Sequence, residues 1–131
     1  MYLLDSNILI YWLKGQGKVT QQLQSKSPQH IKIPAPALFE LEYGTAKSTK
    51  PQLQREFIDA LVQKLEILPL DYPSAKAAGI LRSNLEGKGN LIGPYDLLIA
   101  GIALAHDLTV ITRNTREFAR VPGLRVENWY D

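Results

Sequence analysis

Tyr2-Leu3-Leu4-Asp5-Ser6-Asn7 marks the first change from strand to helix in this chain. The three apolar residues predict a short buried strand, and the three polar residues after them are all good helix N-cap residues. We therefore expect a helix over residues 8–13 directly after the strand. Asp5 then lies where the strand ends, between two apolar segments, so its carboxylate is close to the core. Its position is compatible with a helix cap and with a functional group, and the sequence leaves both open.

The same alternation of strand and helix continues along the chain. Further strands are expected at 31–33, 65–68, 108–111 and 124–127, and further helices at 19–26, 36–46, 51–65, 74–86 and 94–106. This order predicts an α/β domain with a parallel sheet that has helices on both faces. Functional groups in such sheets collect at the carboxyl ends of the strands. Asp5 and the segment Thr112-Arg113-Asn114 both occupy such positions.

Length and composition indicate one globular domain over residues 1–131, because 45% of the residues are hydrophobic. There is no cysteine, which excludes disulfides and thiolate metal sites. The longest apolar run, residues 97–105, is much shorter than the ~20 residues that a membrane span needs. No signal-peptide pattern is visible, so we expect a soluble cytosolic protein. The net charge of +2 and the arginines at 113, 116, 120 and 125 fit either a solvated face or a phosphate-rich ligand.

Three further acidic positions are candidates for chemistry. Asp96 lies in the first turn of the most apolar helix, where it either interacts with the helix dipole or meets another acid. Glu40 and Glu42 share one helix and flank its apolar face at similar angles, so periodicity does not choose between them. Gly44 lies four residues after Glu40 and leaves space beside that carboxylate, which weakly favours Glu40.

Glu117 follows Asn114 by three residues. This spacing is typical of a capping box at a short helical turn, and it is equally compatible with a carboxylate that takes part in a metal site. The sequence does not decide between these two roles.

Four segments read together resemble a known family. Leu3–Asn7, Phe39–Gly44, Ile92–Ala100 and Val110–Phe118 are similar to the motifs of the PIN-domain ribonucleases, and most similar to those of the VapC toxins of bacterial toxin–antitoxin pairs. The resemblance covers essentially the whole chain in the right order. Each motif is weak alone, but four of them at matching spacings are a specific signal.

The resemblance implies a three-layer α/β/α domain with a central parallel sheet of about five strands and an acidic pocket that binds Mg²⁺ or Mn²⁺. The family's metal-binding acids correspond to Asp5, Glu40 and Asp96. The family often has an acid where this chain has Asn114, so either Asn114 or the catalytic candidate Glu117 completes the site. Ser6 matches a hydroxyl residue that supports the site by hydrogen bonding.

The resemblance also implies an activity and partners. It predicts a Mg²⁺-dependent endoribonuclease toxin that cleaves tRNA or rRNA and inhibits translation. The cation would activate a water molecule, leaving a 5′-phosphate and a 3′-hydroxyl. Arg113 and Arg116 are expected to bind RNA phosphates. A homodimer and a complex with a VapB-type antitoxin are expected, with Phe39 and Tyr43 either contacting that partner or buried against a neighbouring helix.

Two other interpretations are a phosphoryl-transfer or receiver domain and an inactive binding module. A dehalogenase-type phosphoryl-transfer site requires Asp-x-Asp after the first strand, where this chain has Asn7 in the second position, and a receiver domain requires an acid and a lysine that Ile33-Pro34 and Glu127-Asn128 do not supply. The remaining alternative is a catalytically inactive PIN-like module that binds RNA or protein. The presence of Asp5, Glu40 and Asp96 together favours the enzyme.

Overall fold

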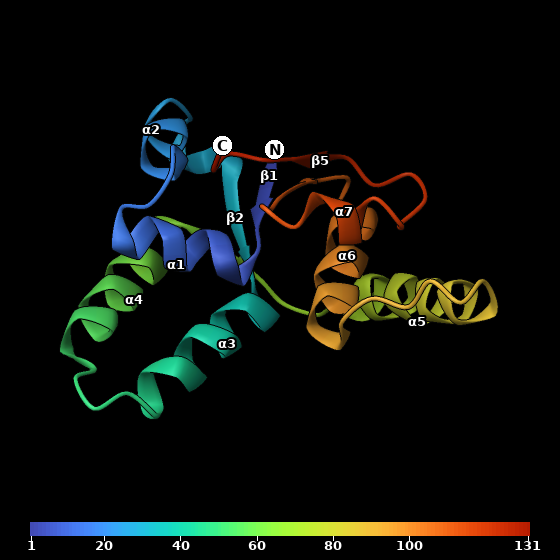
Figure 1. Cartoon of the computed structure of the whole chain (residues 1–131), viewed down its shortest axis with the longest axis horizontal. Helices are drawn as coiled ribbons and strands as arrows, with labels where there is room; N and C mark the ends of the chain where they lie inside the picture. The colour runs from blue at the N-terminus through green and yellow to red at the C-terminus, as the bar shows by residue number, and fades with distance from the viewer.

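Five short strands form one parallel sheet in the computed structural model, which describes all residues 1–131 (Figure 1). The strands are β1 (Tyr2–Leu4), β2 (Ile31–Pro34), β3 (Glu66–Leu68), β4 (Thr109–Ile111) and β5 (Val126–Glu127). Their spatial order is β3-β2-β1-β4-β5, and every neighbouring pair is parallel. The first strand of the chain is therefore the central one, which places Asp5 in the middle of the carboxyl edge of the sheet.

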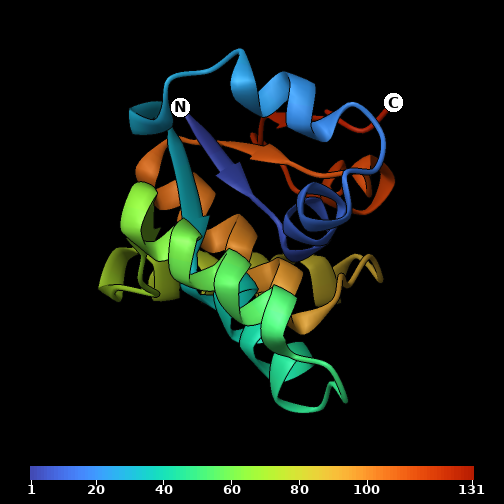
Figure 2. The same cartoon turned by 90° about the vertical axis from the view of Figure 1, so that its left-hand side faces the viewer.

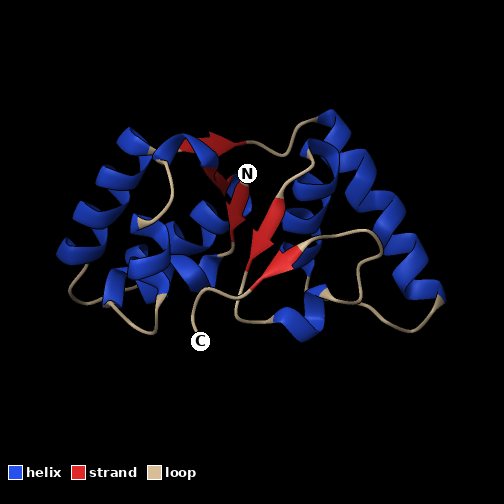
Figure 3. Ribbon diagram, turned by 90° about the horizontal axis from the view of Figure 1, so that it is seen from above, coloured by secondary structure: helices blue, strands red, loops and turns tan.

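Helices cover both faces of this sheet. They are α1 (Ser6–Lys14), α2 (Val19–Gln24), the 3-10 turn η1 (Pro28–His30), α3 (Ala35–Ala46), α4 (Gln52–Lys64), α5 (Tyr72–Gly87), α6 (Pro94–His106) and α7 (Thr115–Phe118). Seen from above, the strands run between two groups of helices (Figure 3), and α1 to α4 form the group that faces the viewer in Figure 2. The three-layer α/β/α fold expected from the sequence is confirmed. None of the helices combines the length and apolarity needed to span a membrane.

The predicted elements are all present, with shifted ends. The helix expected to reach Lys26 ends at Gln24, where the Ser25 hydroxyl donates a hydrogen bond to the Gln22 carbonyl at 2.7 Å. The last strand begins at Val126 instead of Leu124 and ends at Glu127 as expected. Asp71 caps α5, since its Oδ1 accepts from the Ser74 N–H at 3.0 Å.

Helix α6 is fixed against α5 by a close contact. A Cβ at Gly101 would lie 2.7 Å from both the Ala78 Cβ and the Ser74 carbonyl oxygen, so only glycine allows this approach. Ile99, Ala100 and the rest of the middle of α6 are buried in the core. Because α6 runs back from the carboxyl edge of the sheet toward the start of β4, its first turn lies at that edge (Figure 1).

Candidate active site

Asp5 is both a helix cap and a buried carboxylate. Its Oδ1 accepts a hydrogen bond from the Ile8 N–H at 2.9 Å, which satisfies one free donor at the start of α1. Its own N–H donates to the Ile111 carbonyl at 3.1 Å and so ties the end of β1 to the end of β4. The residue is only 3% exposed. The capping role is confirmed, and it uses one oxygen of the carboxylate.

The environment of Asp5 disfavours its charge. Burial raises the pKa of its carboxyl to about 6, with a further contribution from the negative charges of Glu40 and Glu117. Hydrogen bonds from the Thr112 side chain and the Ile8 N–H act in the opposite direction. Other carboxylates are thus close enough to Asp5 to repel it.

Asp96 lies in the first turn of α6 and faces the same group. Its pKa is raised to about 7, first by burial, then by the charge of Glu117 and a hydrogen bond between these two carboxyl groups, and further by Asp5 and Glu40. Two carboxyl groups in contact favour one shared proton, because both cannot carry their charges at low cost.

Glu117 points into the cluster instead of back onto its own helix. Its Oε1 accepts from the Gly93 N–H at 2.6 Å, and the Asn114 amide donates to its Oε2. The Asn114 N–H binds the Thr112 Oγ1 at 2.9 Å, and its side chain makes no capping bond to α7. The capping-box interpretation of Asn114 and Glu117 is therefore wrong. A Cβ at Gly93 would lie 3.5 Å from oxygens of both Asp96 and Glu117, so this glycine sits directly against the carboxyl pair.

The structure distinguishes the roles of Glu40 and Glu42, which periodicity could not do. Glu40 accepts a hydrogen bond from the Ser6 hydroxyl at 2.8 Å, which joins α3 to the start of α1. Glu42 instead forms an ion pair with Arg55 of α4, whose hydrogen bond lowers the pKa of Glu42. Open space surrounds the position where a Gly44 Cβ would be, as the sequence suggested. Glu40 faces the cluster and Glu42 does not.

We call Asp5, Glu40, Asp96 and Glu117 the acidic pocket. Nothing in this arrangement groups three of these side chains closely enough to coordinate one ion at the same time. The donor chemistry nevertheless fits a hard divalent cation, which takes carboxylate oxygens. Burial and, after it, mutual repulsion raise the pKa of Asp5 and Asp96, and a bound cation would remove that repulsion.

The four arginines at 113, 116, 120 and 125 differ in their surroundings. Arg125 pairs with Asp107 at 2.9 Å, and Arg120 donates to the Leu91 carbonyl at 3.1 Å. The Arg113 guanidinium lies 3.7 Å from the centre of the Tyr130 ring, and a hydrogen bond with Tyr11 raises its pKa. Arg116 has no hydrogen bond or ion pair and is exposed.

Sequence reasoning missed three residues that shape the site. Thr112 is fully buried and bonds to Asp5 and to the Asn114 N–H, while Gly93 contacts the carboxyl pair. Both belong to the motif segments quoted above, so their positions carried a signal. Tyr130 lies in the C-terminal segment beyond every motif, and no pattern in the sequence marks it as a neighbour of Arg113.

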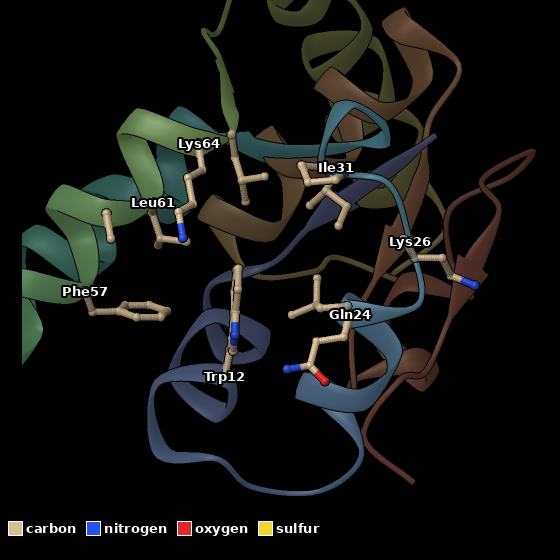
Figure 4. Close-up of a pocket in the computed structure, with 11 residues that line it drawn as sticks. Trp12, Gln24, Lys26, Ile31, Phe57, Leu61 and Lys64 are labelled. Atoms are coloured by element: carbon tan, nitrogen blue, oxygen red, sulfur yellow. The ribbon is translucent and has the colours of Figure 1, made fainter.

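An apolar cavity lies elsewhere. It has a volume of about 500 Å³ and lies between α1, α2 and α4, and no acidic residue lines it. Figure 4 shows the Trp12 side chain between Phe57 and Gln24, and Lys26 pointing its ammonium group away from the cavity toward Tyr2 and Trp129. This cavity has no carboxylate or imidazole in its lining, so the acidic pocket remains the candidate active site.

Comparisons with known proteins agree with this geometry. Residues 2–124 match the PIN domain family model. The tRNA(fMet)-specific endonuclease VapC of Salmonella typhimurium is 35% identical over 128 residues, covering 98% of this chain and 97% of the relative. Ribonuclease VapC2 of Rickettsia felis is 37% identical over 131 residues, covering 98% of both chains.

Solved structures show the same similarity in three dimensions. The DNA-bound VapBC of Salmonella typhimurium has a chain that superposes with a TM-score of 0.91 at 35% identity, covering 98% of this chain and 97% of its own. VapBC2 of Rickettsia felis, bound to a DNA fragment from its promoter, gives a TM-score of 0.90 at 37% identity and 98% coverage of both chains. PIN-domain nucleases generally depend on a divalent metal. The chain belongs to the PIN-domain family and, within it, to the VapC ribonucleases.

Proposed function

We propose that this protein is a Mg²⁺-dependent endoribonuclease, active as a single PIN domain over residues 1–131 and serving as the toxin of a toxin–antitoxin pair. The observation that supports it most is the acidic pocket at the carboxyl edge of the sheet, where burial and mutual repulsion raise the pKa of Asp5 to about 6 and of Asp96 to about 7. Clustered carboxyl groups with raised pKa values are typical of functional sites.

Each acid has a proposed role. Asp5, Glu40 and Asp96 would hold a Mg²⁺ ion, with Mn²⁺ as a substitute, since both take oxygen ligands. When bound, the ion supplies a more acidic water molecule and positive charge beside the phosphate. Glu117 accepts or positions a proton at the water, and the Asn114 amide orients its carboxylate. The Ser6 hydroxyl holds Glu40 in place.

The proposed substrate is RNA, either tRNA or rRNA, whose cleavage would inhibit translation in the cytoplasm. The relative from Salmonella typhimurium is named for its action on tRNA(fMet), which supports the tRNA class without identifying the molecule. Arg113 and Arg116 would bind phosphates beside the scissile bond. Arg113 is held by its ring contact with Tyr130, and Arg116 has no competing protein partner.

The proposed partners are a VapB-type antitoxin and a second copy of the chain. The similar chains from Salmonella typhimurium and Rickettsia felis come from VapBC structures, and this supports an inhibitory antitoxin. Of the two alternatives left open for Phe39 and Tyr43, burial against a neighbouring helix is wrong, because these residues are 53% and 59% exposed. Both side chains are therefore available to contact another molecule.

Incubation of the purified protein with total RNA tests the proposal. We expect cleavage with Mg²⁺, no cleavage with EDTA, and products that carry a 5′-phosphate and a 3′-hydroxyl. The control is Asp5→Asn, which keeps the helix cap. Ends with a 2′,3′-cyclic phosphate would contradict the mechanism. RNA binding with no cleavage under any metal would support the catalytically inactive module instead.

A further inference from the structure

Arg113 lies between two residues that bond to the acidic pocket. The Thr112 side chain bonds to Asp5, and the Asn114 amide donates to the Glu117 carboxylate. The backbone of Arg113 is therefore fixed beside the carboxylates, while its side chain is 46% exposed. A long side chain loses rotamer entropy when it binds a phosphate, so a contact that fixes it beforehand strengthens that binding.

Two tyrosine rings hold the guanidinium group of Arg113. Its central carbon is 3.7 Å from the centre of the Tyr130 ring and 5.7 Å from the centre of the Tyr11 ring. The two rings contact each other edge to face, with their centres 4.6 Å apart. A guanidinium that lies against the face of a ring keeps N–H groups along its edge free to bind a phosphate.

Tyr130 is itself fixed by the rest of the chain. Its carbonyl accepts from the Lys18 N–H at 2.9 Å, and its N–H donates to the Asn128 Oδ1 at 2.8 Å. Trp129, directly before it, is buried in the core. A Cβ at Gly17 would lie 2.7 Å from the Tyr130 ring, and the φ of 62° at this position also favours glycine. The ring that contacts Arg113 therefore has a defined place in the fold.

The carboxylate that competes for Arg113 is a weak partner. The Asp131 Oδ1 is 4.0 Å from the Arg113 Nε, and both side chains are exposed. Ion pairs of this kind contribute little in water. The Asp131 carboxylate also accepts a hydrogen bond from the Asn128 amide at 2.8 Å. A phosphate, which accepts two parallel hydrogen bonds from an arginine, can displace this contact.

We propose that Tyr130 is a positioning residue of the RNA site, because its ring holds the Arg113 guanidinium where it can bind a phosphate next to the acidic pocket. This inference rests on the proposed function. It extends the site from residues 2–124, which match the family model, to the segment 128–131. Tyr130 acts through Arg113 and makes no contact of its own with the RNA.

A double-mutant cycle tests the proposal. The probe is a fluorescein-labelled 12-nucleotide oligouridylate, and its affinity is measured by fluorescence anisotropy in EDTA, where the proposed cleavage does not proceed. We expect Arg113→Met to weaken binding roughly 10-fold and to reduce the slope of log affinity against log salt by about 0.7, the value for one phosphate contact. Tyr130→Leu should weaken binding by about 3- to 10-fold in the wild-type protein and have no effect in Arg113→Met.

Two conservative variants separate positioning from folding. Tyr130→Phe keeps the ring and should bind the probe as the wild type does. Arg113→Lys keeps the charge but has no flat surface to stack on the ring, so it should bind at least about threefold more weakly with an unchanged salt slope. Thermal unfolding shows whether each variant folds, and Arg113→Lys decides the question if Tyr130→Leu does not fold.

Lys26→Met is the matched control. The Lys26 ammonium lies 5.6 Å from the centre of the Tyr2 ring and 5.5 Å from that of Trp129. It is also a cation against aromatic rings, but Tyr2 is at the opposite end of β1 from Asp5. We expect its removal to change the affinity for the probe by less than about twofold, because distant exposed charges are screened by salt.

Three results would overturn the inference. The first is an equal loss from Tyr130→Leu with and without Arg113, because Tyr130 would then act on folding or touch the RNA itself. The second is equal binding by Arg113→Met and Lys26→Met, because only the net charge would then matter. The third is the absence of any binding of the probe by the wild-type protein.

Cleavage of total RNA with Mg²⁺, measured on the same proteins, separates this inference from the proposed function. Metal-dependent cleavage without coupling between Tyr130 and Arg113 would retain the nuclease and overturn the positioning role. Coupled binding of the probe without metal-dependent cleavage would contradict the nuclease and leave the positioning role of Tyr130 in RNA binding standing.

Discussion

Two acidic regions of the molecule use the same residue types with opposite effects. In the acidic pocket, carboxylates face one another, and the pKa of Asp96 rises to about 7. On the other side of α3, Glu42 and Asp59 flank Arg55, and the pKa of Glu42 falls. In the second region Arg55 compensates one of the two negative charges and lies between them. The first holds an excess of negative charge in a poorly hydrated place, and this charge favours a divalent cation.

The two regions also differ in what they contribute to the folding free energy. Surface ion pairs such as that of Glu42 contribute little to folding. A cluster of partly buried like charges costs folding free energy at neutral pH. We therefore expect the members of the acidic pocket to respond to mutation in a different way from Glu42.

Removal of one charge from the centre of the pocket has the largest expected effect. Asp5→Asn or Asp96→Asn should lower the rate of RNA cleavage by roughly 10²–10³-fold, because several kcal/mol of stabilisation by the ion would be lost. Single-turnover rates at saturating Mg²⁺ measure the effect. Circular dichroism spectra equal to those of the wild type would show that the variants fold, and activity within threefold of the wild type would contradict the assignment.

The variants Glu40→Gln and Glu42→Gln compare the two acidic regions within one helix, α3. We expect Glu40→Gln to lose roughly 10- to 100-fold in activity, since it removes a pocket carboxylate. Glu42→Gln should leave the rate unchanged, because its carboxylate faces Arg55. Cleavage rates of the two variants, measured side by side, give the result. Equal losses in both would show that the helix, and not the pocket, is the sensitive feature.

The pH dependence of the free energy of unfolding should reveal how much the buried, mutually repelling carboxylates destabilise the folded state. The folded pKa of Asp96 is about 7 against 3.8 for the free side chain, so the folded state binds more protons between these values. In EDTA, the free energy of unfolding should fall as the pH rises from about 4 to 7. Asp96→Asn lacks this loss and should be more stable than the wild type at pH 8 by roughly 1–3 kcal/mol, an advantage that disappears near pH 4.

Urea unfolding at both pH values in EDTA measures that difference. A wild-type protein that is as stable as Asp96→Asn at pH 8 would mean that the pocket carries no electrostatic cost.

The smallest effect is expected at the ion pair between Glu42 and Arg55. Arg55→Met removes the partner of Glu42 and should change the melting temperature by no more than about 3 °C, because the pair is exposed. RNA cleavage should be unaffected. Thermal unfolding and a cleavage assay on the same sample test both statements, and a large loss of activity would imply that the two regions are coupled.

The fold could be predicted from the sequence because local signals agree with the global pattern. Tyr2-Leu3-Leu4 before Asp5, and Gly93-Pro94 before an apolar run, mark a strand end and a helix start with little ambiguity. The order of the strands within the sheet needs contacts between distant segments, and local patterns do not contain them.

The candidate site was predictable in part. Motif spacing identified Asp5, Glu40 and Asp96, and the structure brings them together with Glu117. Periodicity could not choose Glu40 over Glu42, because that choice depends on Ser6 and on Arg55, which lie on other elements. The role of Glu117 was open for the same reason, since its partner Gly93 is 24 residues away.

Direct titration with MnCl₂ is the measurement closest to the central claim. Isothermal titration calorimetry at pH 7.5 should show binding to the wild-type protein and to Glu42→Gln with similar affinity, and no detectable binding to the double variant Asp5→Asn/Asp96→Asn. Folding of the double variant is checked by its thermal unfolding. Equal binding by all three proteins would contradict cation binding by the acidic pocket, because the cation would then bind elsewhere.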